Sequence, residues 1–270
     1  MSNVIHSARV PEVIRPMLQA YLDHLSQNLS DFAQGVYLHG SIGLDAFDEQ
    51  RSDIDTLVVL SRRGTGDDIL KLTTIHETIA SQYPRWLLEV SYVQAADLGQ
   101  PESVITPHPI YHENTLDAAG NFDTSPVTWW VLKHKGIALL GAEPQQLPFT
   151  TDWEAVLSYM RENINSYWAS FTNNPPRMMR SLPDDGVAWI VFGVLRQYYS
   201  FRENDITSKV GAGEYALKVV PLGWHNLIQD ALDIRQGRKP KRYSSRFTRA
   251  YATIRFTRYI IDKSNALFRS

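Results

Sequence analysis

The segment "LHGSIGLDAFDEQRSDIDTLVVL", residues 38–60, contains two polar clusters, each next to an apolar run. Gly40 and Ser41 follow the first apolar run, and Asp53 and Asp55 stand at the start of the second. Because residues i and i+2 of a strand point to the same side, the two aspartates place their carboxylates on one face, about 7 Å apart along the chain. Two carboxylates at the end of a buried strand suit Mg²⁺, which takes its other ligands from water and substrate phosphates. The segment therefore predicts two strands, joined by a turn, that carry a cation site.

A third carboxylate lies in another apolar segment. Glu89 is part of "WLLEVSYV", residues 86–93, where an ionised carboxylate is costly to bury unless it is paired or bound to a metal. Gly40 lets the backbone approach a phosphate closely, and the hydroxyl and N–H of Ser41 can donate to phosphate oxygens. Together, the three acids and the Gly-Ser turn predict a site for a divalent cation and a polyphosphate.

The composition leaves room for two domains. The chain has 270 residues, of which 43% are apolar and 21% charged, and it contains no cysteine. Disulfides, thiolate zinc sites and cysteine nucleophiles are therefore excluded, and any metal must be held by carboxylates or histidines. The first residues lack the pattern of a secretory or transit peptide, and no apolar run approaches the roughly 18 residues of a membrane span. We expect a cytoplasmic protein without a membrane partner.

Charge is distributed unevenly along the chain. From Arg235 to the end there are 11 Lys and Arg and one acid, so the preceding residues carry 16 basic and 28 acidic side chains. An acidic body suits a cationic small molecule. The basic segment is expected to be a solvated helix, and the alternatives are a nucleic-acid surface or a wall near a polyphosphate. In that helix the expected apolar side holds Phe247, Tyr251, Ile254 and Ile261, and another side holds Arg242, Arg246 and Arg249.

The hydrophobic periodicity changes near residue 150. We therefore predict an α/β (α+β) domain with a mixed sheet over residues 1–150, followed by an all-α helical bundle domain over residues 151–270. The strands expected in the first domain lie at 35–39, 55–60, 86–93 and 137–141, its helices lie at 10–29, 67–81 and 127–136, and a long Pro-rich connection spans 99–126. The helices expected in the second domain lie at 152–172, 185–203, 208–219, 223–236 and 244–268.

The order of these motifs is similar to that of a known superfamily. Gly-Ser, eleven residues, Asp-x-Asp on the next strand and a Glu on a later strand resemble the signature of polymerase-β-type nucleotidyltransferases. The segments "WWVLKHKGIALLG", "VLRQYYSFRENDITSKVGAGEYAL" and "WHNLIQDAL" extend the resemblance to the aminoglycoside adenylyltransferases that modify streptomycin and spectinomycin. The resemblance implies transfer of AMP from ATP to a drug hydroxyl, with release of pyrophosphate, in an active site between the two domains.

The same resemblance implies roles for single residues. Asp53, Asp55 and Glu89 would hold two Mg²⁺ ions, and Glu89 would also be the base that takes the proton from the hydroxyl. The residues that would bind ATP, the co-substrate, are Gly40, Ser41, Ser52, Arg196 and Lys209.

The drug-binding residues depart from the family pattern. The loop after Glu89 lacks the tryptophan with which the family packs on the drug, and Arg235 stands where the family has a tyrosine. The candidates for contact with the drug are Tyr111, His112, Asp184 and Asp185.

Two alternatives stand beside antibiotic adenylylation. One is a nucleotidyltransferase of the same superfamily with another acceptor, namely RNA, a protein or a lincosamide. The other is a domain that binds nucleotide only as a sensor, against which the presence of all three acids argues. The expected partners are ATP and a small cationic antibiotic, without nucleic acid, and the expected oligomeric state is a monomer.

Overall fold

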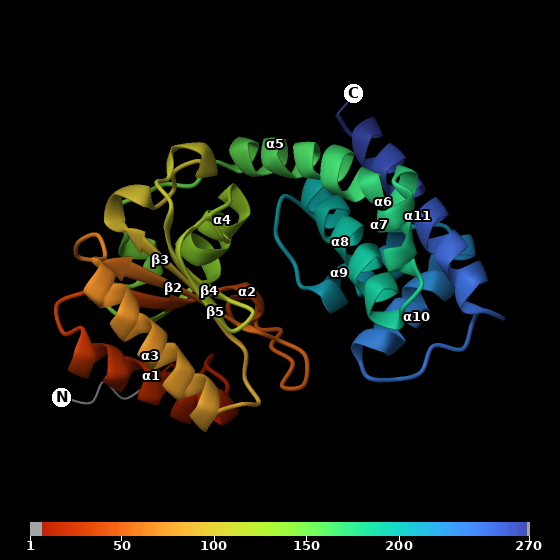
Figure 1. Cartoon of the computed structure of the whole chain (residues 1–270). Helices are drawn as coiled ribbons and strands as arrows, with labels where there is room; N and C mark the ends of the chain where they lie inside the picture. Colours follow the sequence, from red (N-terminus) through yellow and green to blue (C-terminus); the bar gives the residue numbers. More distant parts are fainter. Residues whose placement is uncertain (1–6, 269–270) are drawn as a thin grey trace. The chain divides into compact units, whose positions relative to one another are not determined.

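The computed structural model describes residues 7–268 and divides into two compact units, Met1–Asp152 and Trp153–Ser270. The N-terminal unit holds a sheet with helices on its faces, and the C-terminal unit consists of helices (Figure 1). Within the described residues, no helix has the length and apolar character needed to cross a bilayer.

The sheet of the N-terminal unit is mixed. Its strands are β1 (Ala33–Leu38), β2 (Ile54–Leu60), β3 (Leu88–Gln94), β4 (His108–His112), β5 (Thr115–Gly120) and β6 (Ile137–Leu140), in the order β5-β4-β3-β2-β1-β6. The central pair β2 and β3 is parallel, whereas the other neighbours are antiparallel. A parallel pair needs a crossover connection, which is supplied by α3 (Gly66–Gln82).

The two faces of the sheet are covered by different helices. Alternate residues of the strands, such as Val58 and Val90, pack in one core together with α3 and α1 (Arg15–Asn28). The opposite set, including Leu57, packs on Trp129 and Leu132 of α4 (Pro126–Lys135). This alternation is the period-2 pattern of strands that are buried on both sides. Because Asp55 is two residues before Leu57, its side chain belongs to the α4 face.

The start of the crossover helix is fixed by a local network. Thr65 caps α3, and its hydroxyl accepts from the N–H of Asp68 at 3.3 Å, while the Asp68 carboxylate accepts from the N–H of Thr65 at 2.7 Å. Arg62 adds two hydrogen bonds to the same carboxylate, at 2.6 and 2.9 Å. These contacts satisfy N–H groups that every helix start leaves open and hold the pKa of Asp68 far below its usual range.

The expected long connection at 99–126 is wrong in part, because it contains the hairpin of β4 and β5. The hairpin gives a weak sequence signal. Pro109 lies within β4, although proline is rare inside strands, and β5 reads "TLDAAG" with few strand-forming residues. The turn between them places Glu113 and Asn114 at φ 48° and 59° without a glycine. The expected turn after β1 is a short helix, α2 (Gly40–Gly43).

The helices of the C-terminal unit lie close to their expected positions. They are α5 (Trp153–Asn163), α6 (Ala169–Asn173), α7 (Pro175–Met178), α8 (Asp184–Glu203), α9 (Lys209–Val219), α10 (His225–Arg235) and α11 (Arg246–Ala266), with a π-helical turn at Ile164–Trp168. The core is formed around α8, against which α9, α10 and α11 pack (Figure 1). Gly193 of α8 allows the ring of Trp168 to pack directly on the helix backbone, since a Cβ at this position would overlap that ring.

The faces expected for the basic C-terminal helix are wrong in part. Phe247 and Tyr251 are 61% and 64% exposed, whereas Arg249 is buried. The reason is an ion pair across the unit, in which Arg249 donates to Asp184 at the start of α8. The guanidinium can be buried because it is paired, and the arginines Arg246 and Arg255 lie over the exposed rings instead.

Candidate active site

Three carboxylates converge on the α4 face of the sheet. The parallel register of β2 and β3 pairs Asp55 with Glu89, so the two side chains stand next to each other on the same face. Asp53 precedes β2 and joins them, and one ligand oxygen from each of the three carboxylates lies within 4.8 Å of the others. Glu89 is buried and the two aspartates are half-buried.

The Gly-Ser turn lies directly against this cluster. Gly40 has a φ of 51°, and a Cβ at this position would overlap the Asp55 carboxylate. The N–H of Ser41 donates to that carboxylate, and the N–H of His39 donates to the backbone oxygen of Asp55 at 3.1 Å. The Ser41 hydroxyl is buried without a hydrogen-bond partner among residues 7–268. It is therefore a donor available to a ligand oxygen.

Ser52 stabilises the loop that precedes Asp53. Its hydroxyl accepts from the N–H of Asp48 at 3.0 Å, and its own N–H donates to the carbonyl of Asp48 at 2.8 Å. These two bonds close the turn immediately before the first aspartate of the cluster.

A fourth acid, Asp123, was missed by sequence reasoning. Its Oδ2 lies 3.6 Å from Nδ1 of the buried His39, and its Oδ1 accepts from the hydroxyl of Thr128 at 2.6 Å. Asp123 has a φ of 53° in the turn before α4. The signal available in the sequence was the helix-start pattern "DTSP" at the end of the predicted connection.

The crowding of acids changes their protonation. Burial raises the pKa of Asp55 to about 6; His39 opposes this rise, while Asp123 and Asp53 add to it and the Ser41 N–H opposes it. Burial, together with the neighbouring charges of Asp53, Asp55 and Asp123, raises the pKa of Glu89 to about 8. Both shifts mean that burial and repulsion among the acids outweigh the compensation that the protein supplies.

The donor set fits a hard divalent cation. Three carboxylates supply the oxygen ligands that Mg²⁺ prefers, and a bound cation would offset the repulsion that raises the pKa values of Asp55 and Glu89. The available Ser41 hydroxyl next to Asp55 fits a phosphate oxygen on the same side.

The two candidates on β4 point in opposite directions. Tyr111 is buried on the α3 face, where its ring stacks on His76 with 3.7 Å between centroids. It therefore packs in the core, away from the acids. His112 lies on the other face, where its Nδ1 is 2.8 Å from Oε1 of Glu89. Only His112 is thus brought to the acidic cluster.

The remaining candidates lie in the C-terminal unit. Arg196 is half-buried on α8, and Lys209 is the first residue of α9, directly after the capping Ser208. Asp185 is exposed in the first turn of α8, whereas the carboxylate of Asp184 accepts from Arg249.

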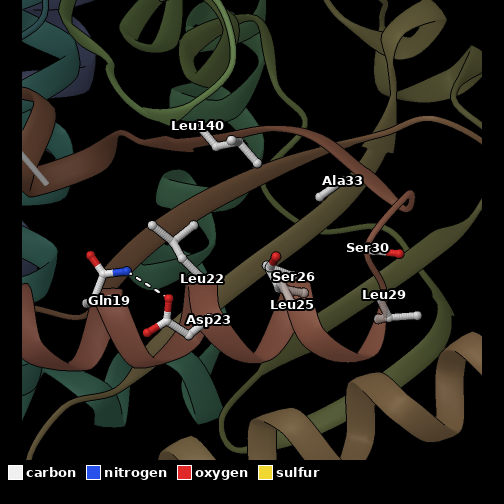
Figure 2. Close-up of a pocket in the computed structure, with 9 residues that line it drawn as sticks. All are labelled: Gln19, Leu22, Asp23, Leu25, Ser26, Leu29, Ser30, Ala33 and Leu140. Carbon is white, nitrogen blue, oxygen red and sulfur yellow. Dashed lines mark hydrogen bonds between the residues drawn. The ribbon is translucent and has the colours of Figure 1, made fainter. Parts of the chain in front are cut away.

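A separate pocket of about 210 Å³ lies in the N-terminal unit beside α1, between Gln19 and Leu140 (Figure 2). It includes none of the candidate residues.

Comparison with known proteins relates the C-terminal unit to a family model and the chain to a known fold. Residues 163–259 match the family model described as aminoglycoside adenylyltransferase, C-terminal domain. The matched residues make up most of the helical unit. The fold is similar to the crystal structure of spectinomycin adenyltransferase AAD(9) from Enterococcus faecialis with ATP and spectinomycin. That match has a TM-score of 0.70 and 15% identity, and it covers 92% of this chain and 98% of the other. No curated protein sequence matches the chain.

These two matches confirm the family resemblance, the fold class and the enzyme class that were predicted from the sequence. The chain combines a mixed sheet with a C-terminal helical region in a nucleotidyltransferase fold, and residues 163–259 of the helical region match the C-terminal domain model of the aminoglycoside adenylyltransferases. The segment that matches this model thus follows in the sequence on the unit that carries the acidic cluster.

Proposed function

We propose that the protein transfers AMP from ATP to a hydroxyl group of an aminoglycoside or aminocyclitol antibiotic. The observation that carries the proposal is the convergence of Asp53, Asp55 and Glu89 within 4.8 Å, beside the Gly-Ser turn. The family match of residues 163–259 supports the antibiotic as acceptor, and the similar AAD(9) structure contains ATP and spectinomycin.

In the proposed reaction, Glu89 takes the proton from the acceptor hydroxyl. The hydroxyl oxygen then forms a bond to the α-phosphorus of ATP, the bond from that phosphorus to the bridging oxygen breaks, and pyrophosphate leaves with the electron pair. Burial and the neighbouring acids raise the pKa of Glu89 to about 8 in the metal-free protein. The proposed cations would lower this pKa, so that with metal bound Glu89 is ionised and can accept the proton. The backbone at Gly40 and the hydroxyl of Ser41 hold phosphate oxygens.

Asp53 and Asp55, with Glu89, would hold the two Mg²⁺ ions. Bound there, the ions would neutralise charge on the phosphates and lower the pKa of the attacking hydroxyl. The role of the polypeptide is to keep the three carboxylates together on one face, with Gly40 close to Asp55.

The C-terminal unit completes the proposed site. Arg196 and Lys209 would bind the triphosphate of ATP, and Asp185 would attract the cationic drug. We propose that the active form is a cytoplasmic monomer with residues 1–150 as catalytic domain and residues 151–270 as the domain that completes the ATP and substrate cleft.

The test is an assay of the purified protein with ATP, Mg²⁺ and a panel that contains streptomycin, spectinomycin, other aminoglycosides, a lincosamide and RNA. We expect pyrophosphate release together with a mass increase of one AMP on an aminoglycoside or aminocyclitol. Release with RNA or the lincosamide alone would replace the antibiotic class proposed here. Absence of release with every acceptor would contradict the transferase function.

Glu89→Gln separates the base from a purely metal-binding role. We expect this variant to bind ATP with Mg²⁺ nearly as tightly as wild type in titration calorimetry. Its rate should fall by about 10²–10⁴, because the proton acceptor is lost. A large loss of ATP affinity with little change in the rate of the bound state would make Glu89 chiefly a metal ligand.

A further inference from the structure

Glu89 has a neighbour to which the proposed reaction gives no role. His112 lies on β4, whose antiparallel register with β3 pairs Tyr111 with Val90. Continuing this register by one residue places His112 opposite Glu89 on the same face of the sheet. Nδ1 of His112 lies 2.8 Å from Oε1 of Glu89, although the two groups are not aligned as an in-line hydrogen bond. The closeness of the two side chains therefore follows from strand pairing.

The ring of His112 also packs against an aromatic ring. The ring of Phe122 lies 4.1 Å from it, centroid to centroid, with an angle of 33° between the planes. The backbone carbonyl of Phe122 accepts a hydrogen bond of 2.7 Å from the hydroxyl of Ser91, which is two residues after Glu89 on β3. The imidazole thus contacts both the Glu89 carboxylate and an aromatic ring whose backbone is hydrogen-bonded to β3.

The two side chains differ in their exposure. The side chain of His112 is 37% exposed, whereas that of Glu89 is only 7% exposed. The imidazole, 2.8 Å from the buried carboxylate, limits the rotamers that Glu89 can adopt. General-base catalysis needs the carboxylate oxygen within about 2.6–3.2 Å of the atom that carries the proton.

We propose that His112 is a positioning residue, which holds the Glu89 carboxylate in the orientation that takes the proton from the acceptor hydroxyl. This inference rests on the function proposed above. It assigns to His112 an action through Glu89 rather than direct contact with the drug. Removal of groups that orient the side chains of an active site typically costs about 10–100-fold in activity.

The test compares two variants at this position. His112→Leu keeps an apolar side chain against Phe122 and removes the ring nitrogen, whereas His112→Asn returns a side-chain nitrogen close to the position of Nδ1. We expect His112→Leu to lower kcat by about 10–100-fold, with KM for ATP and for the acceptor within about twofold of wild type. His112→Asn should recover most of kcat. The control His24→Asn makes the same chemical change on α1, on the other face of the sheet, and should leave kcat unchanged.

Two results would overturn the positioning role. One is a wild-type kcat in His112→Leu, and the other is a loss confined to KM for the acceptor, which would make His112 a drug-binding residue. Thermal unfolding checks that the variants are folded, and His112→Asn keeps the comparison possible if the leucine variant is not.

Crystal structures of wild type and His112→Leu supply a readout that needs no turnover. We expect Glu89 in one conformation in wild type and in a displaced position or several positions in the variant. If wild type adenylylates the drug but Glu89 keeps its position in His112→Leu, the positioning role fails. If wild type modifies none of the acceptors, the proposed function fails independently of the Glu89 conformation.

Discussion

At the scale of the residue, the candidate site depends on how closely the Gly40 backbone approaches Asp55. Gly40 combines a left-handed φ of 51° with a position at which any Cβ would overlap the Asp55 carboxylate. Both conditions are met only by glycine at low cost. The same close approach brings the N–H of Ser41 onto Asp55 and leaves the Ser41 hydroxyl available.

Gly40→Ala should therefore damage both stability and activity. We expect a loss of about 1–2 kcal/mol in the free energy of unfolding from the left-handed backbone alone, and a fall in kcat because Asp55 must move. Gly66→Ala is the matched control, because nothing lies within 4 Å of a Cβ at the first residue of α3. Urea denaturation and the pyrophosphate assay measure the two effects. Equal behaviour of the two variants would contradict the proposed importance of the close approach.

Asp55→Asn should abolish turnover and yet stabilise the metal-free protein. Because burial raises the pKa of this acid from 3.8 to about 6, its charge opposes folding as the pH rises through that window. At pH 7 the neutral amide should raise the free energy of unfolding by about 1–3 kcal/mol. Asp53→Asn should also abolish turnover. Undiminished activity in either variant would contradict the proposed role of these aspartates as metal ligands. Calorimetry with Mg²⁺ measures metal binding without turnover.

At the scale of the element, the crossover helix α3 anchors the sheet through a buried polar chain. Nε2 of His76 lies 2.7 Å from the hydroxyl of Tyr92, which lies 2.7 Å from the hydroxyl of Tyr21 on α1. The ring of His76 also stacks on Tyr111 of β4. One histidine thus connects α3 with a central and a peripheral strand.

His76 should make stability depend on pH. Burial lowers its pKa to about 3, whereas a histidine in the unfolded chain titrates near 6.5. Above pH 6.5 the contribution of His76 to the free energy of unfolding is complete. As the pH falls below this value, the unfolded chain binds a proton that the folded chain does not, and the contribution decreases by about 1.4 kcal/mol per pH unit. In urea titrations, the stability advantage of wild type over His76→Gln should shrink from pH 7 to pH 5. An advantage that stays constant would contradict a buried neutral His76.

The elements that could be predicted from the sequence are those whose apolar residues follow a clear strand or helix pattern. The strand that follows Asp53, the strand around Glu89 and the helix between them have long apolar patterns, so the meeting of the three acids could be expected from strand geometry. The hairpin of β4 and β5 has no such pattern. Asp123 depends on that hairpin and on a left-handed turn, so its approach to His39 could not be read from the sequence.

At the scale of the whole molecule, the proposed function divides the work between two units. The N-terminal unit holds the acidic cluster, and the C-terminal unit holds Arg196 and Lys209. The body before Arg235 carries 16 basic and 28 acidic residues, which favours a cationic acceptor. An anionic nucleotide therefore needs cations from elsewhere, and the proposed sources are bound Mg²⁺ and these two basic side chains.

Lys209→Ala tests this division in the intact chain. If Lys209 binds the triphosphate, its loss should weaken ATP binding by about 1.5–3 kcal/mol, the range for a hydrogen bond to a charged group. Lys218→Ala, near the other end of α9, is the control with the same loss of charge. Titration calorimetry with ATP and Mg²⁺ measures both. Equal affinity of the two variants for ATP would indicate that the nucleotide is bound by the N-terminal unit alone.

The parallel pairing of β2 and β3 also constrains how the sequence can change in evolution. Asp55 and Glu89 are paired because Ile54 and Leu88, the first residues of the two strands, are paired in the parallel register. The length of the chain between the strands therefore does not affect this alignment. Insertions between Leu60 and Leu88 can be absorbed by the ends of the crossover. In contrast, loss of one residue within β3 before Glu89 would turn that carboxylate to the α3 face. Among natural variants of this protein, we expect changes of length to gather in the crossover and to be absent from the two strands.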